Sequence, residues 1–409
     1  MTSRERVLKA INFEEADRVP IDVGGMGSTG IMAVAYHELK QYLGIKGGHT
    51  RVSSVGPMLA TVERPLLDRF GIDVIPLSSV ISEDPDDDSK WKPMQFPDGT
   101  PVQMPTVFDV LIDEEGGWIK LDKEGRVVER MPKNGFYFEG VPGPSTFPGE
   151  PQEQLKVEDF KIGPIRDDKL EFLERRSKFL YENTDRAILG DCPGAALFNL
   201  GLGGFTEWMV TLMTDKPYVH AMLDKAVEGT IRNIKTYQQA VGDRVFALSI
   251  SDDMGMQKGE YIRPDLFEEL FTPHYKDLCR WFHENTNYKV FLHSCGSMYN
   301  LIETLIDCGV DILNPVQTSA ANMEPRRLQR EFGGRIVFWG GGCETQRVLP
   351  FGTPEEVRQQ VKERMEIFAP GGGFVFTQVH NVQANTPPEN ILAMLEAALE
   401  FGKYPIRNV

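Results

Sequence analysis

The sequence predicts a single (β/α)8 barrel, and three observations support this prediction. Eight short apolar runs rich in Val, Ile and Phe recur along the 409 residues. The sequence between these runs has apolar residues at helical spacing. Continuous apolar strands that alternate with helices indicate a parallel sheet covered on both faces. The length suggests two or three domains, but barrels with insertions also reach this size. Eight repeating units favour a closed barrel over an open sheet.

The expected strands follow the eight apolar runs in order: Val19–Val23, Ile72–Leu77, Ala187–Gly190, Val245–Ser251, Tyr288–His293, Val310–Leu313, Arg335–Trp339 and Phe374–Gln378. Two helices have clear start signals. Thr353-Pro-Glu-Glu is a capping box that opens a helix over Glu355–Phe368, and Pro387-Pro-Glu-Asn opens a last helix through Phe401. The other expected helices are Ser3–Ile11, Ala33–Leu43, Thr61–Phe70, Lys169–Glu182, Phe205–Thr214, Pro217–Val241, Pro264–Glu284 and Ser297–Asp307.

The alternation of strands and helices stops after the second strand. There the sequence predicts a hairpin of Trp118–Leu121 and Val127–Arg130, together with Pro/Gly-rich loops around Pro142–Pro151. We interpret residues 78–166 as an insertion over the barrel mouth, within one barrel domain that spans residues 1–409.

The charge balance excludes several classes of partner. Forty-four Lys and Arg against 60 Asp and Glu give a net charge of −16, which disfavours binding to nucleic acid or to an anionic membrane. Neither a transmembrane run nor a signal peptide is evident, so we expect a cytoplasmic protein with reduced thiols. The five cysteines lack scaffold spacing, and each is a buried apolar residue, a metal ligand or a nucleophile.

Polar and metal-binding residue types gather where the expected strands end, which is where catalytic groups lie in such barrels. His293 and Cys295 are two residues apart at one strand exit, so both can point into the mouth. A nitrogen and a sulfur ligand suit Zn²⁺, and Cys343 at a later strand exit could be the third ligand. The alternative is a hydrogen-bonded core histidine with inert buried thiols.

Other strand exits carry candidates for catalysis and substrate binding. His380 is a candidate metal ligand or acid/base, or else a merely hydrogen-bonded residue. Asp252 and Asp253 leave one strand together, so one carboxylate could contact metal or substrate while the other caps the next turn. The candidates for binding substrate are Gln317, Gln378 and Asn381.

Two glycine-rich stretches resemble nucleotide or phosphate sites. Residues 25–30 match G-x-G-x-x-G, but no strand ending in an acidic residue follows about 20 positions later, so we reject a dinucleotide site. Gly340–Gly342 follows the seventh expected strand, where barrels often bind phosphate, but a tight turn explains it equally well.

Several long blocks resemble the uroporphyrinogen decarboxylase superfamily, whose fold is a (β/α)8 barrel. The resemblance runs from Arg4-Glu-Arg-Val-Leu-Lys-Ala-Ile-Asn to Pro388-Glu-Asn-Ile-Leu-Ala-Met and is weakest in the insertion. Its densest blocks are Phe291-Leu-His-Ser-Cys-Gly-Ser, Gly309-Val-Asp-Ile-Leu-Asn-Pro-Val-Gln, Thr345-Gln-Arg-Val-Leu-Pro-Phe-Gly-Thr-Pro-Glu-Glu-Val and Ala369-Pro-Gly-Gly-Gly-Phe.

Within this superfamily, the sequence is similar to the cobalamin-dependent methyltransferases. The decarboxylases carry arginines after the first strand that grip substrate carboxylates, whereas no arginine occurs here between Arg18 and Arg51. The methyltransferases bind zinc through His-x-Cys, which His293 and Cys295 match, and through a later cysteine. Gly372 stands at that later position in this chain, so Cys343 would have to replace it.

The resemblance implies a zinc-dependent methyltransferase with a methoxylated aromatic compound as the favoured substrate. Zinc would polarise the heteroatom that carries the methyl group, and Asp252, Asp253 or His380 would position substrate or manage a proton. The chain has no Asp-x-His-x-x-Gly corrinoid-ligand motif, so cobalamin would arrive on a partner corrinoid protein. The direction of transfer and self-association into a homodimer are left open. The rival functions are a metal-independent decarboxylase of a small acid and a non-catalytic, zinc-stabilised barrel.

Overall fold

The structure is a computed structural model that describes residues 1–77, 87–141 and 154–407. Parts of the expected insertion, including the loops around Pro142–Pro151, lie outside these residues. Its centre is a seven-stranded parallel sheet in the order β15-β14-β13-β12-β11-β10-β3, so each strand pairs with its neighbour in sequence. These strands are β3 (Val74–Pro76), β10 (Ala187–Asp191), β11 (Ala247–Ser251), β12 (Lys289–His293), β13 (Ile312–Asn314), β14 (Val337–Trp339) and β15 (Phe374–Val375).

The segment expected as the first strand, Val19–Val23, joins the two ends of this sheet. Ile21 forms a parallel bridge with Phe376, and the Asp22 amide donates to the Phe376 carbonyl at 2.9 Å. On the other side, the Asp73 amide donates to the Ile21 carbonyl at 2.8 Å. The segment makes one isolated bridge and hydrogen bonds to both sides rather than a regular strand, yet it supplies the eighth position of the ring. The predicted barrel fold is therefore confirmed.

Helices surround the sheet, and an apolar layer fills the space between them. The helices are α1 (Ser3–Ile11), α2 (Ala33–Tyr42), α3 (Arg64–Arg69), α4 (Asp167–Asn183), α5 (Phe205–Thr214), α6 (Lys216–Val241), α7 (Pro264–Leu270), α8 (Thr272–Asn285), α9 (Tyr299–Cys308), α10 (Pro325–Phe332), α11 (Val348–Phe351), α12 (Pro354–Phe368) and α13 (Pro388–Phe401). Short 3-10 turns cover Gly27–Thr29, Asp88–Lys90, Phe198–Leu200 and Gly242–Arg244.

Helix α1 lies across the end of the barrel opposite the mouth. Its apolar residues Val7, Ala10 and Ile11 belong to the same buried cluster as the strand residues inside the barrel, such as Phe291 and Trp339. An amphipathic helix can cover the open end of a barrel in this way because one apolar stripe meets the interior side chains. The chain start thereby becomes part of the core.

Most expected helices form, with three differences. The expected helix Thr61–Phe70 begins later, as α3. The expected helix Pro264–Glu284 is divided into α7 and α8, because Pro273 has no amide hydrogen to donate to the preceding turn. The short helices α10 and α11 were not expected. The Thr353 capping box was expected, and both of its hydrogen bonds form.

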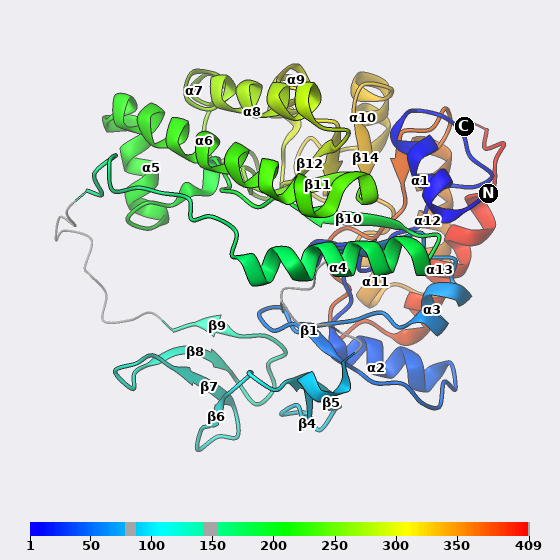
Figure 1. The fold of residues 1–409 in the computed structure, drawn as a ribbon. Helices are drawn as coiled ribbons and strands as arrows, with labels where there is room; N and C mark the ends of the chain where they lie inside the picture. The colour runs from blue at the N-terminus through cyan, green and yellow to red at the C-terminus, as the bar shows by residue number, and fades with distance from the viewer. Residues whose placement is uncertain (78–86, 142–153, 408–409) are drawn as a thin grey trace.

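The insertion contains more strands than the single expected hairpin. The expected hairpin is β7 (Trp118–Leu121) paired with β8 (Val127–Met131), and it lies in a four-stranded antiparallel sheet with β6 (Leu111–Ile112) and β9 (Glu139–Gly140). A second hairpin pairs β4 (Trp91–Gln95) with β5 (Pro101–Pro105). Strand β5 lies beside β1 (Val52–Ser54), which forms a small hairpin with β2 (Leu59–Ala60). The strands of the insertion lie at the bottom of Figure 1.

Candidate functional site

A cavity of about 670 Å³ opens at the carboxyl ends of the barrel strands. The glycine-rich loop from Gly24 to Gly30 forms one wall, and the ends of β10, β11 and β12 form another. His293, His380 and Asp253 line it, so three candidates from different strand exits meet at one cavity. The glycine-rich loop is thus a wall of the mouth.

His293 and Cys295 come from the exit of β12. His293 ends the strand, and the Cys295 sulfur lies 3.4 Å from its Nε2 atom. The turn that follows requires glycine at position 296, where φ is +85° and a Cβ atom would lie 2.4 Å from the backbone of Gly255. This close approach fixes the path of the His-Ser-Cys-Gly segment, and with it the direction of the Cys295 side chain.

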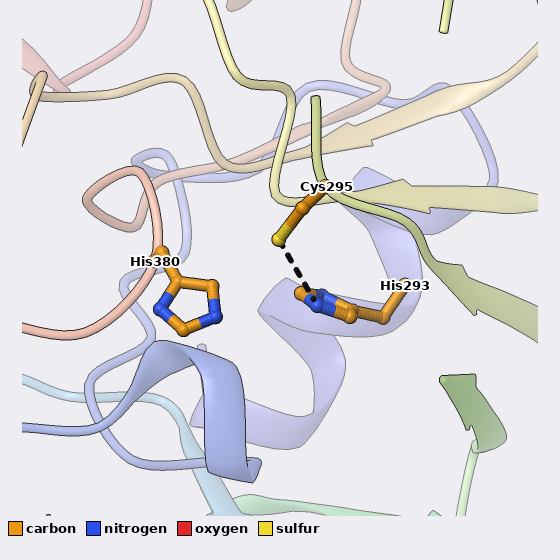
Figure 2. A group of neighbouring side chains, drawn as sticks. All are labelled: His293, Cys295 and His380. Carbon is orange, nitrogen blue, oxygen red and sulfur yellow. Dashed lines mark hydrogen bonds between the residues drawn. The ribbon is translucent and has the colours of Figure 1, made fainter. Parts of the chain in front are cut away.

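His380 completes a group of three side chains. One nitrogen each from His293 and His380 and the sulfur of Cys295 lie within 4.8 Å of one another (Figure 2). The His380 backbone has φ +65°, a left-handed conformation that is uncommon for a residue other than glycine and is often found at functional sites.

Burial makes both histidines neutral at ordinary pH. It lowers the pKa of His293, and burial together with the neighbouring His293 lowers the pKa of His380 to about 4. Burial, with the negative charge of Asp253, raises the pKa of Cys295 to about 12. A bound cation would reverse this last effect, because a coordinating thiol loses its proton. The group therefore suits a cation better than it suits a free thiolate nucleophile.

The adjacent aspartates have different surroundings. The Asp253 side chain is about half exposed (49 %), accepts a hydrogen bond from the Cys295 amide at 2.7 Å, and lies 3.7 Å from His293 Nε2. Asp252 is fully buried and accepts hydrogen bonds from the amides of Phe198 and Asn199 at 2.8 Å. Its other donors are the Asn199 side chain and the Tyr275 hydroxyl. Asp252 therefore holds a loop, and Asp253 faces the site.

The three candidate substrate-binding residues hold loops around the mouth. Gln317 accepts a hydrogen bond from the Gly296 amide at 2.8 Å, beside Cys295. The buried Gln378 donates to the Thr29 carbonyl at 2.9 Å. The Asn381 side chain accepts from the Gly30 amide at 3.1 Å and also lines the cavity. Contact of any of them with substrate stays a prediction.

The structure does not bring Cys343 into the group of His293, Cys295 and His380. Cys343 is fully buried and belongs to the apolar layer between strands and helices. Its charged neighbours are Glu344 and Arg364, and burial raises the pKa of its thiol. His380 is the third residue that stands with His293 and Cys295, so the choice of Cys343 as a zinc ligand stays a prediction without support from this geometry.

Sequence reasoning missed two residues behind His293. The Asn314 side chain is fully buried, and its Oδ1 atom lies 2.6 Å from His293 Nδ1. The Ser28 hydroxyl donates to the same oxygen at 2.9 Å. Asn314 stands at a strand exit, as the other candidates do, and that position was the available signal.

The donor set fits a zinc ion. Two imidazole nitrogens and one thiol from a mostly buried cluster are ligands that Zn²⁺ prefers, and three protein ligands leave a position open for substrate. Asn314 behind His293 resembles the hydrogen-bonded partners that orient histidine ligands in metal sites. The arrangement could therefore hold zinc with an open coordination position toward the cavity.

Comparison with known proteins supports the fold and identifies the family. The family model for uroporphyrinogen decarboxylase (URO-D) matches residues 197–401. The uroporphyrinogen decarboxylase of Methylococcus capsulatus is 30 % identical over 101 residues, which cover 25 % of this chain and 27 % of that protein. The enzyme of the same name from Anaeromyxobacter dehalogenans is 23 % identical over 207 residues, covering 49 % and 54 %. The chain thus matches about half, or less, of the length of these relatives.

A solved structure extends the likeness over the whole chain. The methyltransferase from Methanosarcina mazei has a TM-score of 0.59 at 18 % identity, covering 98 % of this chain and 99 % of that one. At this identity the likeness shows a common fold. Among the described residues, every helix is too short or too polar to cross a membrane.

Proposed function

The chain belongs to the uroporphyrinogen decarboxylase family, and within it we propose a zinc-dependent methyltransferase. It moves a methyl group between a small methylated substrate and the cobalt of a corrinoid carried by a partner protein. The observation that carries this proposal is the group of His293, Cys295 and His380 at the barrel mouth. A decarboxylase that uses no metal has no need of a nitrogen and sulfur cluster at this place.

These three side chains are the proposed ligands. When bound there, zinc supplies a Lewis acid that polarises the substrate heteroatom carrying the methyl group. Transfer of the methyl group to the partner's cobalt would leave the bonding electron pair on the heteroatom. Asp253 is exposed enough to exchange protons with water and close enough to the site to pass one to that heteroatom.

The charge of the mouth supports a substrate without several carboxylates. Among the described residues, the lining of the mouth cavity contains no lysine or arginine, but it contains Asp191 and Asp253. The segments 78–86 and 142–153 have no lysine or arginine in their sequence either. A multiply charged acid would lack the cationic forks that normally bind carboxylates. An aryl methyl ether remains the favoured substrate, with the demethylating direction as the first to test.

A metal-independent decarboxylase of a small acid is the second candidate. The family name favours it, and so does a cavity of about 1000 Å³ that adjoins the mouth at Gly24 and Pro76. Five arginines line that cavity: Arg4, Arg51, Arg64, Arg176 and Arg186. At least some of them serve the fold, since Arg186 donates to Asp68 and to the Ile72 carbonyl.

Zinc content of purified protein tests the proposal. We expect about one zinc per chain in the wild type and little in Cys295→Ser and His380→Ala, because each variant loses one of three ligands. Cys343→Ser should keep its zinc and is the matched control. Zinc loss in Cys343→Ser with retention in His380→Ala would instead identify Cys343 as the ligand.

Chelation separates the rival functions. A methyltransferase should stay folded without zinc but lose methyl transfer. The absorbance change of the corrinoid, with an aryl methyl ether or a simple thiol as substrate, measures this transfer. Unfolding on chelation, without activity before it, would indicate a structural zinc. Decarboxylation that survives chelation would establish the second candidate.

A further inference from the structure

The hydrogen bonds behind His293 form one connected, buried network. Asn314 Oδ1 accepts from the Ser28 hydroxyl at 2.9 Å and lies 2.6 Å from His293 Nδ1. Asn314 Nδ2 donates to the Trp339 carbonyl at 2.8 Å. Ser28 belongs to the glycine-rich loop, while the other residues end β12, β13 and β14. The network therefore joins several strand exits beneath the mouth cavity.

The Trp339 carbonyl determines the orientation of the Asn314 amide. A carbonyl only accepts hydrogen bonds, so the group facing it must be the amide NH₂ and not the amide oxygen. The opposite orientation would place two oxygens 2.8 Å apart in a buried site and cost a hydrogen bond. Asn314 Oδ1 is consequently fixed toward His293 and Ser28.

This orientation determines which nitrogen of His293 carries the proton. Asn314 Oδ1 can only accept, so Nδ1 of a neutral His293 must donate, and the lone pair then lies on Nε2. Nε2 is the atom that faces Cys295 and Asp253. The buried amide thus holds His293 in the tautomer that a metal ligand requires.

We propose that Asn314 and Ser28 are positioning residues that hold His293 in the Nδ1–H tautomer before any metal binds. Asn314 sets the tautomer directly, and Ser28 stabilises the Asn314 oxygen in its place. The inference rests on the proposed function only for the identity of the metal, because the tautomer is a property of the metal-free protein.

Asp22 extends the same network to the first wall of the mouth. The Trp339 indole donates to Asp22 Oδ2 at 2.8 Å, and the Gly25 amide donates to Asp22 Oδ1 at 2.7 Å. Asp22 is fully buried, so these bonds hold the glycine-rich loop to β14. The loop that carries Ser28 is therefore fixed relative to the strand that orients Asn314.

Nitrogen-15 NMR of the metal-free protein tests the tautomer. Two-bond proton–nitrogen correlations at pH about 8, where an ordinary imidazole is neutral, distinguish a protonated ring nitrogen from an unprotonated one. We expect the wild-type His293 signals to show the proton on Nδ1. A proton on Nε2 would overturn the inference, whether or not the protein binds zinc.

Three variants separate positioning from general destabilisation. Asn314→Leu should remove the preference of His293 for a proton on Nδ1 and weaken zinc binding by about 10- to 100-fold, measured by competition with a chromophoric chelator. Asn314→Asp keeps an acceptor for Nδ1 and should retain the Nδ1–H tautomer, although it loses the hydrogen bond to the Trp339 carbonyl and should therefore lower the free energy of unfolding. Asn390→Leu removes another buried asparagine, one that bonds to the carbonyls of Leu349 and Gly352 and has no contact with the site. This control should leave both readouts unchanged.

The two readouts also distinguish the two proposals. If Asn314→Leu keeps the Nδ1–H tautomer and the wild-type zinc affinity, Asn314 does not position His293. If the wild type shows the expected tautomer but binds no zinc, the zinc function fails while the inference on the tautomer stands. Ser28→Ala should change the His293 tautomer and the zinc affinity less than Asn314→Leu does. An equal or larger change would contradict the assignment of Asn314 as the residue that sets the tautomer directly.

Discussion

Asp252 and Asp253 are neighbours in sequence whose side chains point in different directions from the exit of β11. Asp252 is buried against Phe198, Asn199 and Tyr275, where burial raises the pKa of its carboxyl in spite of four hydrogen bonds. Asp253 accepts from the Cys295 amide, and its side chain is about half exposed to solvent. Alternation along an extended chain separates adjacent side chains in this way.

We expect Asp252→Ala to destabilise the fold and Asp253→Ala to leave stability almost unchanged. Removal of Asp252 leaves buried amides and a hydroxyl without their acceptor, which should lower the free energy of unfolding by roughly 2–4 kcal/mol. Urea denaturation measures both variants. If Asp253→Ala proves less stable than Asp252→Ala, Asp252 is not the residue that holds the loop.

At the residue scale, the site could be predicted from the sequence in part. His293 and Cys295 were predicted as neighbours because an extended segment places residues i and i+2 on one side. The position of His380 beside His293 and Cys295 depends on its left-handed backbone conformation, which no local sequence pattern predicts for a histidine. Cys343 comes just after the glycine-rich turn at Gly340 and Gly341, where φ is positive. The strand rule that side chains alternate between two faces does not hold through such a turn, so it cannot predict where the Cys343 side chain points.

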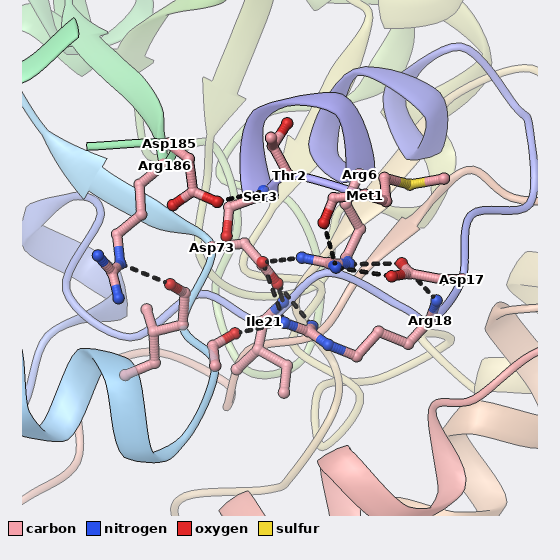
Figure 3. A network of polar contacts seen from close by, with 12 residues as sticks. Met1, Thr2, Ser3, Arg6, Asp17, Arg18, Ile21, Asp73, Asp185 and Arg186 are labelled. Atoms are coloured by element: carbon pink, nitrogen blue, oxygen red, sulfur yellow. Dashed lines mark hydrogen bonds and ion pairs between the residues drawn. The ribbon is translucent and has the colours of Figure 1, made fainter. Parts of the chain in front are cut away.

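At the element scale, an ion network ties α1 to the strands at the end of the barrel opposite the mouth (Figure 3). The buried Asp73 accepts from Arg6 at 2.6 Å and from Arg18 at 2.7 Å. Arg6 also pairs with Asp17 at 2.7 Å, and the Ile21 amide donates to Asp73 at 2.8 Å. The same carboxylate thus holds the helix and the irregular first strand.

The Arg6–Asp17 pair predicts a change of stability in acid. The hydrogen bond from Arg6 lowers the pKa of Asp17 from 3.8 to about 2. A lowered carboxyl pKa stabilises the fold above pH 3.8, and this contribution is lost as the pH falls from 3.8 toward 2. Because Asp17 is partly exposed, we expect about 1 kcal/mol after screening by solvent.

Asp17→Asn should therefore be less stable than the wild type at pH 7, and the difference should shrink as the pH falls to about 2. Chemical denaturation across this pH range provides the measurement. A difference that stays constant with pH would show that the charge of Asp17 contributes nothing.

Elements with strong local signals were predictable, and those that depend on distant contacts were not. The Thr353 capping box defines the start of α12 from four residues alone. The segment Val19–Val23 has the composition of a strand, but it forms a single bridge, from Ile21 to Phe376, and one backbone hydrogen bond to Asp73 on the other side. The division between α7 and α8 at Pro273 has a local cause and could have been predicted.

At the scale of the whole molecule, the insertion reaches the barrel mouth. Tyr137 and Phe138 line a cavity of about 300 Å³ together with His380 and Asn381. The Gln103 amide donates to the Thr50 carbonyl at 2.8 Å, which joins β5 to the barrel side. The break in the alternation of strands and helices predicts an insertion at residues 78–166, but short polar strands leave too weak a pattern to predict how they pair into sheets.

The insertion and the barrel share one apolar core, and this core determines whether they unfold together. Trp118 packs against Phe96 and Phe108 at 5.5 and 5.9 Å between ring centres, and these side chains belong to the same buried cluster as the apolar layer around the barrel. A continuous apolar core couples the two parts, because loosening one exposes surface of the other. We therefore expect a single domain, and a single thermal transition in calorimetry.

Two tryptophan variants test this coupling, since Trp118 lies in the insertion and Trp208 in α5 beside the barrel, and both are buried. Truncation of a buried tryptophan costs about 3–5 kcal/mol, so Trp118→Ala and Trp208→Ala should each move the same transition down by a few degrees. Zinc content should stay that of the wild type in Trp118→Ala, because the proposed ligands all lie on the barrel. If Trp118→Ala instead produces a separate early transition that Trp208→Ala does not, the insertion is a domain of its own and the mouth is formed between two domains.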